Sequence, residues 1–198
     1  MQEKINYVAN IRFPTEKAHG LQIAKMCEAF IHSGTDVTLI VPRRKNKVKD
    51  DPFKYYDIQT RFKVKKLWTI NIVQHTYLGF VFSSLIFGIS SYIYLLCQRD
   101  KYVIYSMDID PISFIFLPLL ERPIFFDIHG PKRRTWPYKW LMKHISGVIT
   151  INDFTKNQLV RAFNRLENRI IVFPNGVNLE RTFSGRRKDA RKHLGLSE

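Results

Sequence analysis

The chain has 198 residues, of which 45% are hydrophobic and 14% aromatic, so it is long enough to bury the core of one α/β domain and too apolar to be disordered overall. Its formal net charge of +15 favours an anionic partner, such as a phosphorylated ligand, an anionic lipid or a nucleic acid. Cys27 and Cys97 both lie in apolar segments, which predicts buried free thiols rather than a disulfide, and no Cys/His spacing is typical of zinc. No apolar signal segment precedes the first predicted strand.

The first part of the chain predicts a βαβ unit. Lys4–Asn10 is a short apolar strand, a helix is expected to begin at Gly20, and the β-branched run Thr35–Val41 is a second strand. Such strands are parallel, and the loop between the first strand and the helix then lies at the carboxyl edge of the sheet. Open α/β folds bind their ligands at that edge.

Strands and helices continue to alternate along the rest of the chain. The basic stretch 43–56 is expected to be a loop, and Asn152 or Asp153 is a suitable N-cap for one of the later helices. This alternation predicts an α/β fold with a doubly wound, Rossmann-like parallel sheet. Further strands are expected over 61–67, 102–106, 124–128, 147–151 and 169–173, and helices over 111–120, 136–145, 154–163 and 186–194.

One segment raises the question of a membrane. No Asp, Glu, Lys or Arg lies between Lys66 and Arg99, and the stretch Thr76–Cys97 is long enough to span a bilayer. A spanning helix would place the strands before and after it on opposite sides of the membrane, which a single sheet forbids. We therefore expect a helix that is partly buried on the sheet and partly at a membrane surface, with monotopic embedding and full spanning as the less favoured alternatives.

Three polar loops are expected to meet at the carboxyl edge of the sheet. In the first, Lys17 and His19 precede Gly20, and a glycine at a helix start lets backbone N–H groups approach a phosphate. In the second, His129-Gly130 follows a buried strand, where a histidine can donate a hydrogen bond or act in acid–base chemistry. In the third, Asn175-Gly176 is part of a Pro-Asn-Gly turn. Each loop also has a purely structural interpretation, as a cap, a satisfied histidine or a turn.

Three strings give a specific resemblance that covers essentially the whole chain. The opening unit ends in GTDVTLIVP, a later strand and helix read GVITINDFTKNQL, and the last strand leads into IIVFPNGVNLERTF. Together they resemble the N-terminal domain of a family four glycosyltransferase of the GT-B fold. The chain departs from the family pattern at His19-Gly20, where many members have two glycines, and at Asn178, where aspartate is usual.

The resemblance implies a domain organisation. Residues 1–183 would form the N-terminal, acceptor-side domain, which is one half of a GT-B architecture. Residues 184–198 would begin the linker to a C-terminal donor-binding domain, and that domain is absent from this sequence. The chain would then be a truncated enzyme or one subunit of a split enzyme with a donor-domain partner chain.

The resemblance also implies an activity and site residues. Family members transfer a sugar from a nucleotide-sugar donor to a glycan or lipid-linked acceptor, with retention of configuration and without metal or other cofactor. His129 would be the catalytic residue that lines the cleft, beside Gly130, and Lys17, His19 and Gly20 would face a phosphate. Asn175 and Gly176 would shape the cleft floor, and Lys132, with Arg133 and Arg134, would meet an anionic acceptor or lipid headgroups.

These implications favour a hexosyltransferase-type enzyme of cell-envelope polysaccharide synthesis, inactive without its donor domain. It would be cytoplasmic and peripheral or monotopic at the inner face of the cell membrane, where basic residues favour an anionic surface. The alternative is a non-catalytic, membrane-associated module that binds glycan or lipid. A nucleic-acid partner is not expected, because no nucleic-acid motif occurs and aromatic residues are not interleaved with the basic runs.

Overall fold

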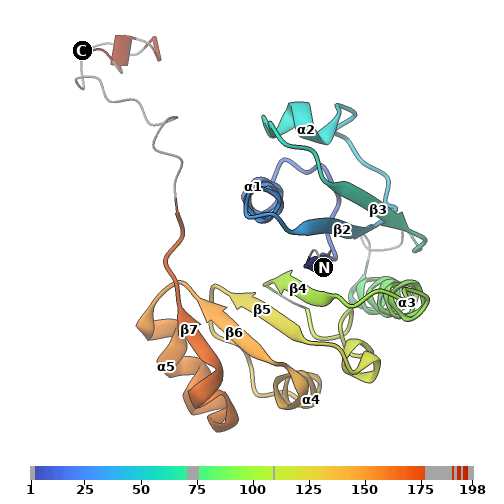
Figure 1. The fold of residues 1–198 in the computed structure, drawn as a ribbon, viewed down its shortest axis with the longest axis vertical. Helices are drawn as coiled ribbons and strands as arrows, with labels where there is room; N and C mark the ends of the chain where they lie inside the picture. The colour runs from blue at the N-terminus through green and yellow to red at the C-terminus, as the bar shows by residue number, and fades with distance from the viewer. Residues whose placement is uncertain are drawn as a thin grey trace.

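A computed structural model describes residues 3–70, 76–108, 110–176, 189, 191–192 and 194–195 of the chain. Its centre is a seven-stranded, entirely parallel sheet with the order β3-β2-β1-β4-β5-β6-β7 (Figure 1). The predicted doubly wound parallel sheet is therefore confirmed. The strands are β1 (Lys4–Val8), β2 (Asp36–Pro42), β3 (Lys63–Leu67), β4 (Val103–Met107), β5 (Ile124–Ile128), β6 (Gly147–Thr150) and β7 (Ile170–Val172).

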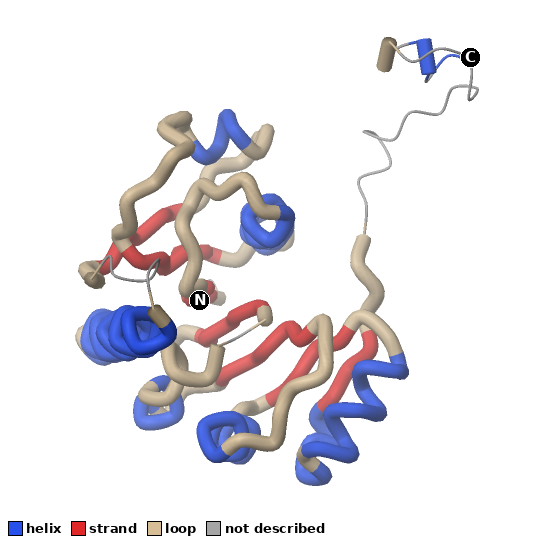
Figure 2. Tube along the Cα trace, turned by 180° about the vertical axis from the view of Figure 1, so that it is seen from behind, coloured by secondary structure: helices blue, strands red, loops and turns tan. Residues whose placement is uncertain are grey.

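Helices cover the sheet in two layers that lie on opposite faces (Figure 2). One core is formed with α1 and contains Ile23 and Cys27, while the other contains Phe87 from α3 and Leu141 from α4. Strands buried on both faces alternate between the two cores, as expected for a parallel sheet covered on both sides. The helices are α1 (Ala18–His32), α2 (Pro52–Tyr55), α3 (Tyr77–Leu96), α4 (Trp136–His144) and α5 (Asp153–Ala162), and the 3₁₀ helices are η1 (Leu117–Leu120) and η2 (Asn164–Arg169).

Three local predictions were wrong. The first helix begins at Ala18 instead of Gly20. The expected helix over 111–120 is a series of turns followed by η1, because Pro118 supplies no N–H and disfavours a continuous α-helix. The expected loop 43–56 contains α2, whose N-cap Asp51 accepts hydrogen bonds from the N–H groups of Phe53 and Lys54.

The cysteines are both free thiols, and Cys27 is fully buried as predicted. Cys97 is exposed, which corrects the prediction that both are buried, because it caps the end of α3 where the helix leaves the sheet. Most residues of the helix expected over 186–194 lie outside the part of the chain that the structure describes. The same is true of most of the predicted linker 184–198, and Asn178 also lies outside it.

The uncharged segment forms the 20-residue helix α3, which is long and apolar enough to cross a membrane by length and composition. Only 39% of its most apolar window is buried inside the fold. The part of the prediction that places this helix partly on the sheet is confirmed, since Phe87 and Leu95 belong to the core. Its contact with a membrane stays a prediction.

Candidate functional site

His129 is held at the carboxyl edge of the sheet by the strand that precedes it. Its Nε2 lies 3.0 Å from Oδ1 of Asp127, a side chain only 5% exposed, and its Nδ1 lies 3.9 Å from Oδ2 of Asp108. Asp127 lies on β5 and His129 directly follows the last residue of this strand, Ile128, so the two side chains are two positions apart in the sequence. Carboxylates therefore flank both ring nitrogens and restrict how the imidazole can turn.

Asp108 joins the ends of β4 and β5. Its Oδ1 accepts hydrogen bonds from the backbone N–H of His129 at 3.1 Å and from Nζ of Lys132 at 3.1 Å. Its own N–H donates to the carbonyl of Asp127. The φ of Asp108 is 42°, in the left-handed region, which costs free energy for a residue other than glycine and is tolerated best by Asn and Asp. The carboxylate of Asp108, held on this strained backbone, fixes the loop that carries His129.

Gln22 of α1 contacts two of the three predicted loops. Its Nε2 lies 3.4 Å from Nε2 of His129, and the same amide donates to Oδ1 of Asn175 at 3.3 Å. One side chain from the first helix thus contacts the loop after β5 and the loop after β7. The expected convergence is therefore observed for the loops after β5 and β7, which meet at the first helix.

The electrostatics of the site are set by burial. Burial raises the pKa of Asp127, and the neighbouring His129 opposes that rise. Beneath the site, burial and the charge of Asp127 raise the pKa of Tyr105. Burial, followed by the charge of Lys17, lowers the pKa of His19, so the neutral imidazole is favoured there.

The first loop is built differently from what the sequence suggested. Gly20 is buried in the first turn of α1, and a Cβ at this position would lie 2.5 Å from Cγ2 of Thr15 and still closer to the hydroxyl of Tyr56. That hydroxyl donates to the carbonyl of Thr15 and accepts from its N–H. A packing requirement therefore explains Gly20 by itself, while Lys17 is exposed and His19 is half-buried.

The remaining predicted residues divide into two groups. Lys132 belongs to the site, with its side chain 13% exposed and its ammonium on Asp108. Gly130 and Gly176 have open space where a side chain would project, so neither needs to be glycine for packing. Arg133 and Arg134 are exposed, and Arg134 lines a different cavity.

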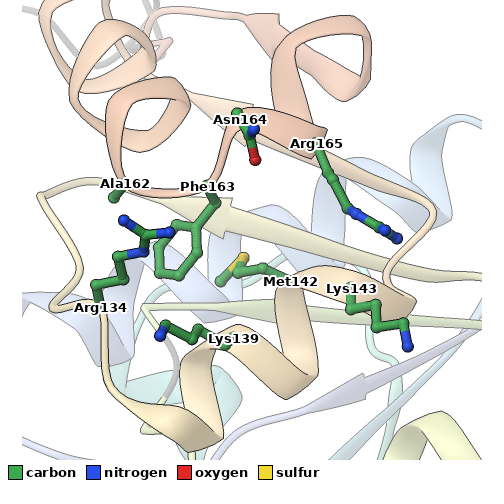
Figure 3. Close-up of a pocket in the computed structure, with 8 residues that line it drawn as sticks. All are labelled: Arg134, Lys139, Met142, Lys143, Ala162, Phe163, Asn164 and Arg165. Atoms are coloured by element: carbon green, nitrogen blue, oxygen red, sulfur yellow. The ribbon is translucent and has the colours of Figure 1, made fainter.

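That cavity lies between α4 and the turn after α5, with a volume of about 280 Å³ (Figure 3). Four basic side chains surround the apolar Met142 and Phe163 in the close-up. None of its lining residues contacts His129, so it is separate from the site. The basic residues are Arg134, Lys139, Lys143 and Arg165.

A second polar cluster lies at the same sheet edge, around Asn10 after β1. Its amide donates to Asp110 at 3.0 Å and to Ser113 at 2.6 Å, and its carbonyl oxygen accepts from Arg44 at 2.7 Å. Burial lowers the pKa of Arg44, and Asp110 opposes that shift. The buried Nε of Arg44 has no hydrogen-bond partner within the described part of the chain.

Sequence reasoning missed Asp108, Asp127 and Gln22 as site residues. Asp127 at the end of a buried strand and His129 directly after it were a usable signal, because polar groups at this end of a parallel strand lie at the ligand-binding edge of the sheet. Nothing local in the sequence distinguishes Gln22 or the left-handed Asp108. Among the described residues, no group of three His, Cys, Asp or Glu side chains has a geometry that could hold a metal ion.

Comparison with solved structures shows the GT-B, Rossmann-like glycosyltransferase fold. A glycosyltransferase from Rickettsia africae matches with a TM-score of 0.61 at 11% identity, over 100% of this chain and 50% of that one. The lipopolysaccharide outer core galactosyltransferase WaaB matches with a TM-score of 0.61 at 14% identity, over 89% and 46%. The catalytic domain of starch synthase IV from Arabidopsis thaliana, bound to ADP and acarbose, matches with a TM-score of 0.58 at 12% identity, over 90% and 52%.

The chain thus spans about half the length of these solved structures. No curated protein matches it. The model of Glycosyltransferase Family 4 matches residues 20–181, which include α1 from Gly20 onward, every strand after β1 and the loops after β5 and β7. This chain belongs to glycosyltransferase family 4.

Proposed function

We propose that this chain is the acceptor-side half of a retaining, nucleotide-sugar-dependent glycosyltransferase. A donor-binding domain, on the same polypeptide or on a partner chain, completes the cleft, and the chain alone does not transfer sugar. The acceptor is a glycan or a lipid-linked glycan, the transferred group is a hexose, and the reaction needs no metal. Membership of the family and the half-length match to GT-B structures support this assignment.

The observation that carries the proposal is the contact of Gln22 with both His129 and Asn175. It links α1 to the loops after β5 and β7 at the edge where open α/β sheets bind ligands. A surface whose polar groups converge from separate elements binds and orients a ligand better than isolated side chains do.

Each residue has a role in this proposal. His129 donates a hydrogen bond to the transferred sugar, and Asp127 orients its ring. Asp108 holds the loop and keeps Lys132 at the rim, where its positive charge attracts the phosphates of the donor or of the acceptor. Lys17 and the first turn of α1 add N–H groups and positive charge for the same phosphates.

The test is sugar transfer by the protein expressed from the complete gene. Radiolabelled UDP-, GDP- and ADP-sugars are offered with a glycan and lipid extract as acceptor, and NMR of the product gives the anomeric configuration. We expect transfer with retention that persists in EDTA. Inversion of configuration, or loss of transfer in EDTA that a divalent cation restores, contradicts the proposal. Acceptor binding without transfer by any donor supports the non-catalytic module instead.

A further inference from the structure

The polarity of α3 is reversed relative to that of a helix on a water-soluble protein. The face that packs on the fold is rich in small and polar residues, including Ser83, Ser84, Gly88 and Ser91, all of them buried. The opposite face is apolar. A helix of a soluble domain normally places its apolar stripe against the core and its polar residues in water.

Specific contacts fix this orientation. Ser84 accepts a hydrogen bond from Asn10 at 3.1 Å, and Ser83 accepts one from Arg44 at 3.2 Å. Ser90 donates to the carbonyl of Trp68 at 3.0 Å. A Cβ on Gly88 would lie 2.9 Å from the carbonyl oxygen of Ser113, so the helix backbone approaches the loop after β4 closely. Rotation of α3, or its withdrawal to span a bilayer, would break all of these contacts.

The exposed large apolar residues of α3, together with Trp68, form a set that we call the α3 stripe. From Leu78 onward its helical members follow one another at intervals of four, seven, four and three residues, which places them on one side of the helix, and Tyr77 adjoins Leu78 in the first turn. Two aromatic residues lie at its borders, as is typical of proteins that sit at a membrane interface. The α3 stripe consists of Trp68, Tyr77, Leu78, Phe82, Ile89, Ile93 and Leu96, which are between 42% and 78% exposed.

Exposed basic residues lie on β3 and just beyond the C-terminal end of α3, while α3 itself carries no charged side chain. Lys65 and Lys66 are exposed on the edge strand β3, and the ammonium of Lys65 lies 5.3 Å from the ring centroid of Tyr94 on α3. Arg99 and Lys101 are exposed just beyond the end of the helix. In the same helical layer, α4 contributes the basic cavity of Figure 3. This charge is complementary to an anionic surface and opposes close packing of a second basic copy.

We propose that the α3 stripe inserts into the headgroup region of an anionic lipid bilayer, with α3 lying in the plane of the membrane and the sheet outside it. Apolar side chains reach the acyl boundary, and the surrounding lysines and arginines bind lipid phosphates. The surface is separate from the site around His129, so this proposal does not depend on the transfer reaction.

The test is sedimentation of the chain with vesicles of phosphatidylcholine alone or mixed with phosphatidylglycerol. We expect binding to the mixed vesicles that weakens as salt is added, because exposed charges are screened. The double variant Phe82→Gln, Ile89→Gln is expected to lose roughly tenfold or more of its affinity for the vesicles, since two apolar side chains lose their burial in lipid. Phe154→Gln is the matched control, because this phenylalanine is 68% exposed on α5, compared with 59% for Phe82.

A second pair of variants tests the charges. The double variant Lys139→Gln, Lys143→Gln is expected to weaken binding to the anionic vesicles. The control double variant Lys47→Gln, Lys54→Gln is expected to leave binding nearly unchanged; Lys47 precedes α2 and Lys54 lies within it. Equal binding of the Phe82/Ile89 variant and the parent chain overturns the proposal. Light scattering without lipid tests whether a second copy of the chain covers this surface instead. If the parent chain is a dimer, the Phe82/Ile89 variant is a monomer and neither binds vesicles, the surface is an interface between copies and the membrane proposal is overturned.

The depth of a tryptophan side chain in the bilayer can be measured without the glutamine variants, so this test does not depend on whether those variants fold. In a Trp136→Phe background, brominated lipids are expected to quench tryptophan fluorescence, and adding Trp68→Phe is expected to remove most of that quenching. Quenching that persists without Trp68 contradicts insertion of this border of the α3 stripe.

Discussion

Nε2 of the His129 imidazole lies 3.0 Å from the carboxylate of Asp127, which is buried near the end of β5. The pair couples a solvent-accessible histidine to a buried acid. The substitution Asp127→Asn preserves the shape of the side chain while it removes the charge.

We expect the stability of Asp127→Asn, relative to the wild type, to rise with pH. Because burial raises the pKa of Asp127 in the folded state, the fold favours its protonated form. Its contribution is then most favourable below the unfolded value of about 3.9 and is lost as the pH rises through the folded pKa. Urea denaturation of both proteins from acid to neutral pH measures this difference. The contributions of the other carboxylates to the pH dependence are the same in both proteins and cancel in the difference. A difference that stays constant or falls with pH contradicts the assigned direction.

Gly20→Ala is expected to destabilise the fold by about 1 to 3 kcal/mol, as overpacking of a tight contact does. The new methyl group would collide with Thr15 and with the hydroxyl of Tyr56. Gly130→Ala is the control, because nothing lies within 4 Å of the position that its Cβ would occupy. Its free energy of unfolding is expected to change by less than about 0.5 kcal/mol. Equal effects of the two substitutions would show that the packing beneath α1 is not as described.

Glu28 and Lys25 form an ion pair on α1, and a substitution of Glu28 tests its contribution to stability. Its carboxylate accepts from Lys25 at 2.8 Å and from the backbone N–H groups of Gln59 and Thr60. Burial opposes ionisation, but these hydrogen bonds outweigh it and lower the pKa of Glu28.

Glu28→Gln is therefore expected to cost about 1 to 3 kcal/mol of stability at neutral pH. Because the folded pKa is lowered, the contribution of the carboxylate is fully present above the unfolded pKa and is lost as the pH falls through the folded value. The cost of Glu28→Gln should shrink accordingly in acid. The exposed Glu167→Gln provides the control, and a cost that grows in acid would contradict the assignment.

The two thiols are expected to react differently. Cys97 is exposed, whereas Cys27 is fully buried and burial raises its pKa, which disfavours the reactive thiolate. Ellman's reagent should therefore label one thiol rapidly in the native chain and two in urea, and Cys97→Ser should remove the rapid phase. Rapid native labelling in Cys97→Ser would mean that Cys27 is accessible.

Regular patterns made most of the fold predictable. All seven strands were predicted, most of them from apolar runs, and their alternation with helices predicted the parallel sheet with its polar loops at one edge. Local rules also contained two signals that were not used, the Asp51-Pro52 helix start and the helix-breaking Pro118.

Contacts between distant segments set the limit of prediction. Gly20 resembled a phosphate-binding glycine, yet its environment depends on Tyr56, which is far away in the sequence. Gln22 and Asp108 enter the site through side-chain contacts with residues more than twenty positions away. No local pattern encodes such pairings. The family resemblance predicts a catalytic role for His129, whereas the partners of His129 required the structure.

The most direct test of the account is sugar transfer by His129→Ala in the protein expressed from the complete gene, beside His144→Ala. His144 is exposed on α4 and contacts Trp140, away from the converging loops, so it is the matched control. We predict that His129→Ala lowers kcat by about 100-fold or more, as loss of a positioned hydrogen-bond donor does, while His144→Ala retains nearly full activity. Full activity of His129→Ala in a folded protein would remove this histidine, and the site built around it, from the reaction.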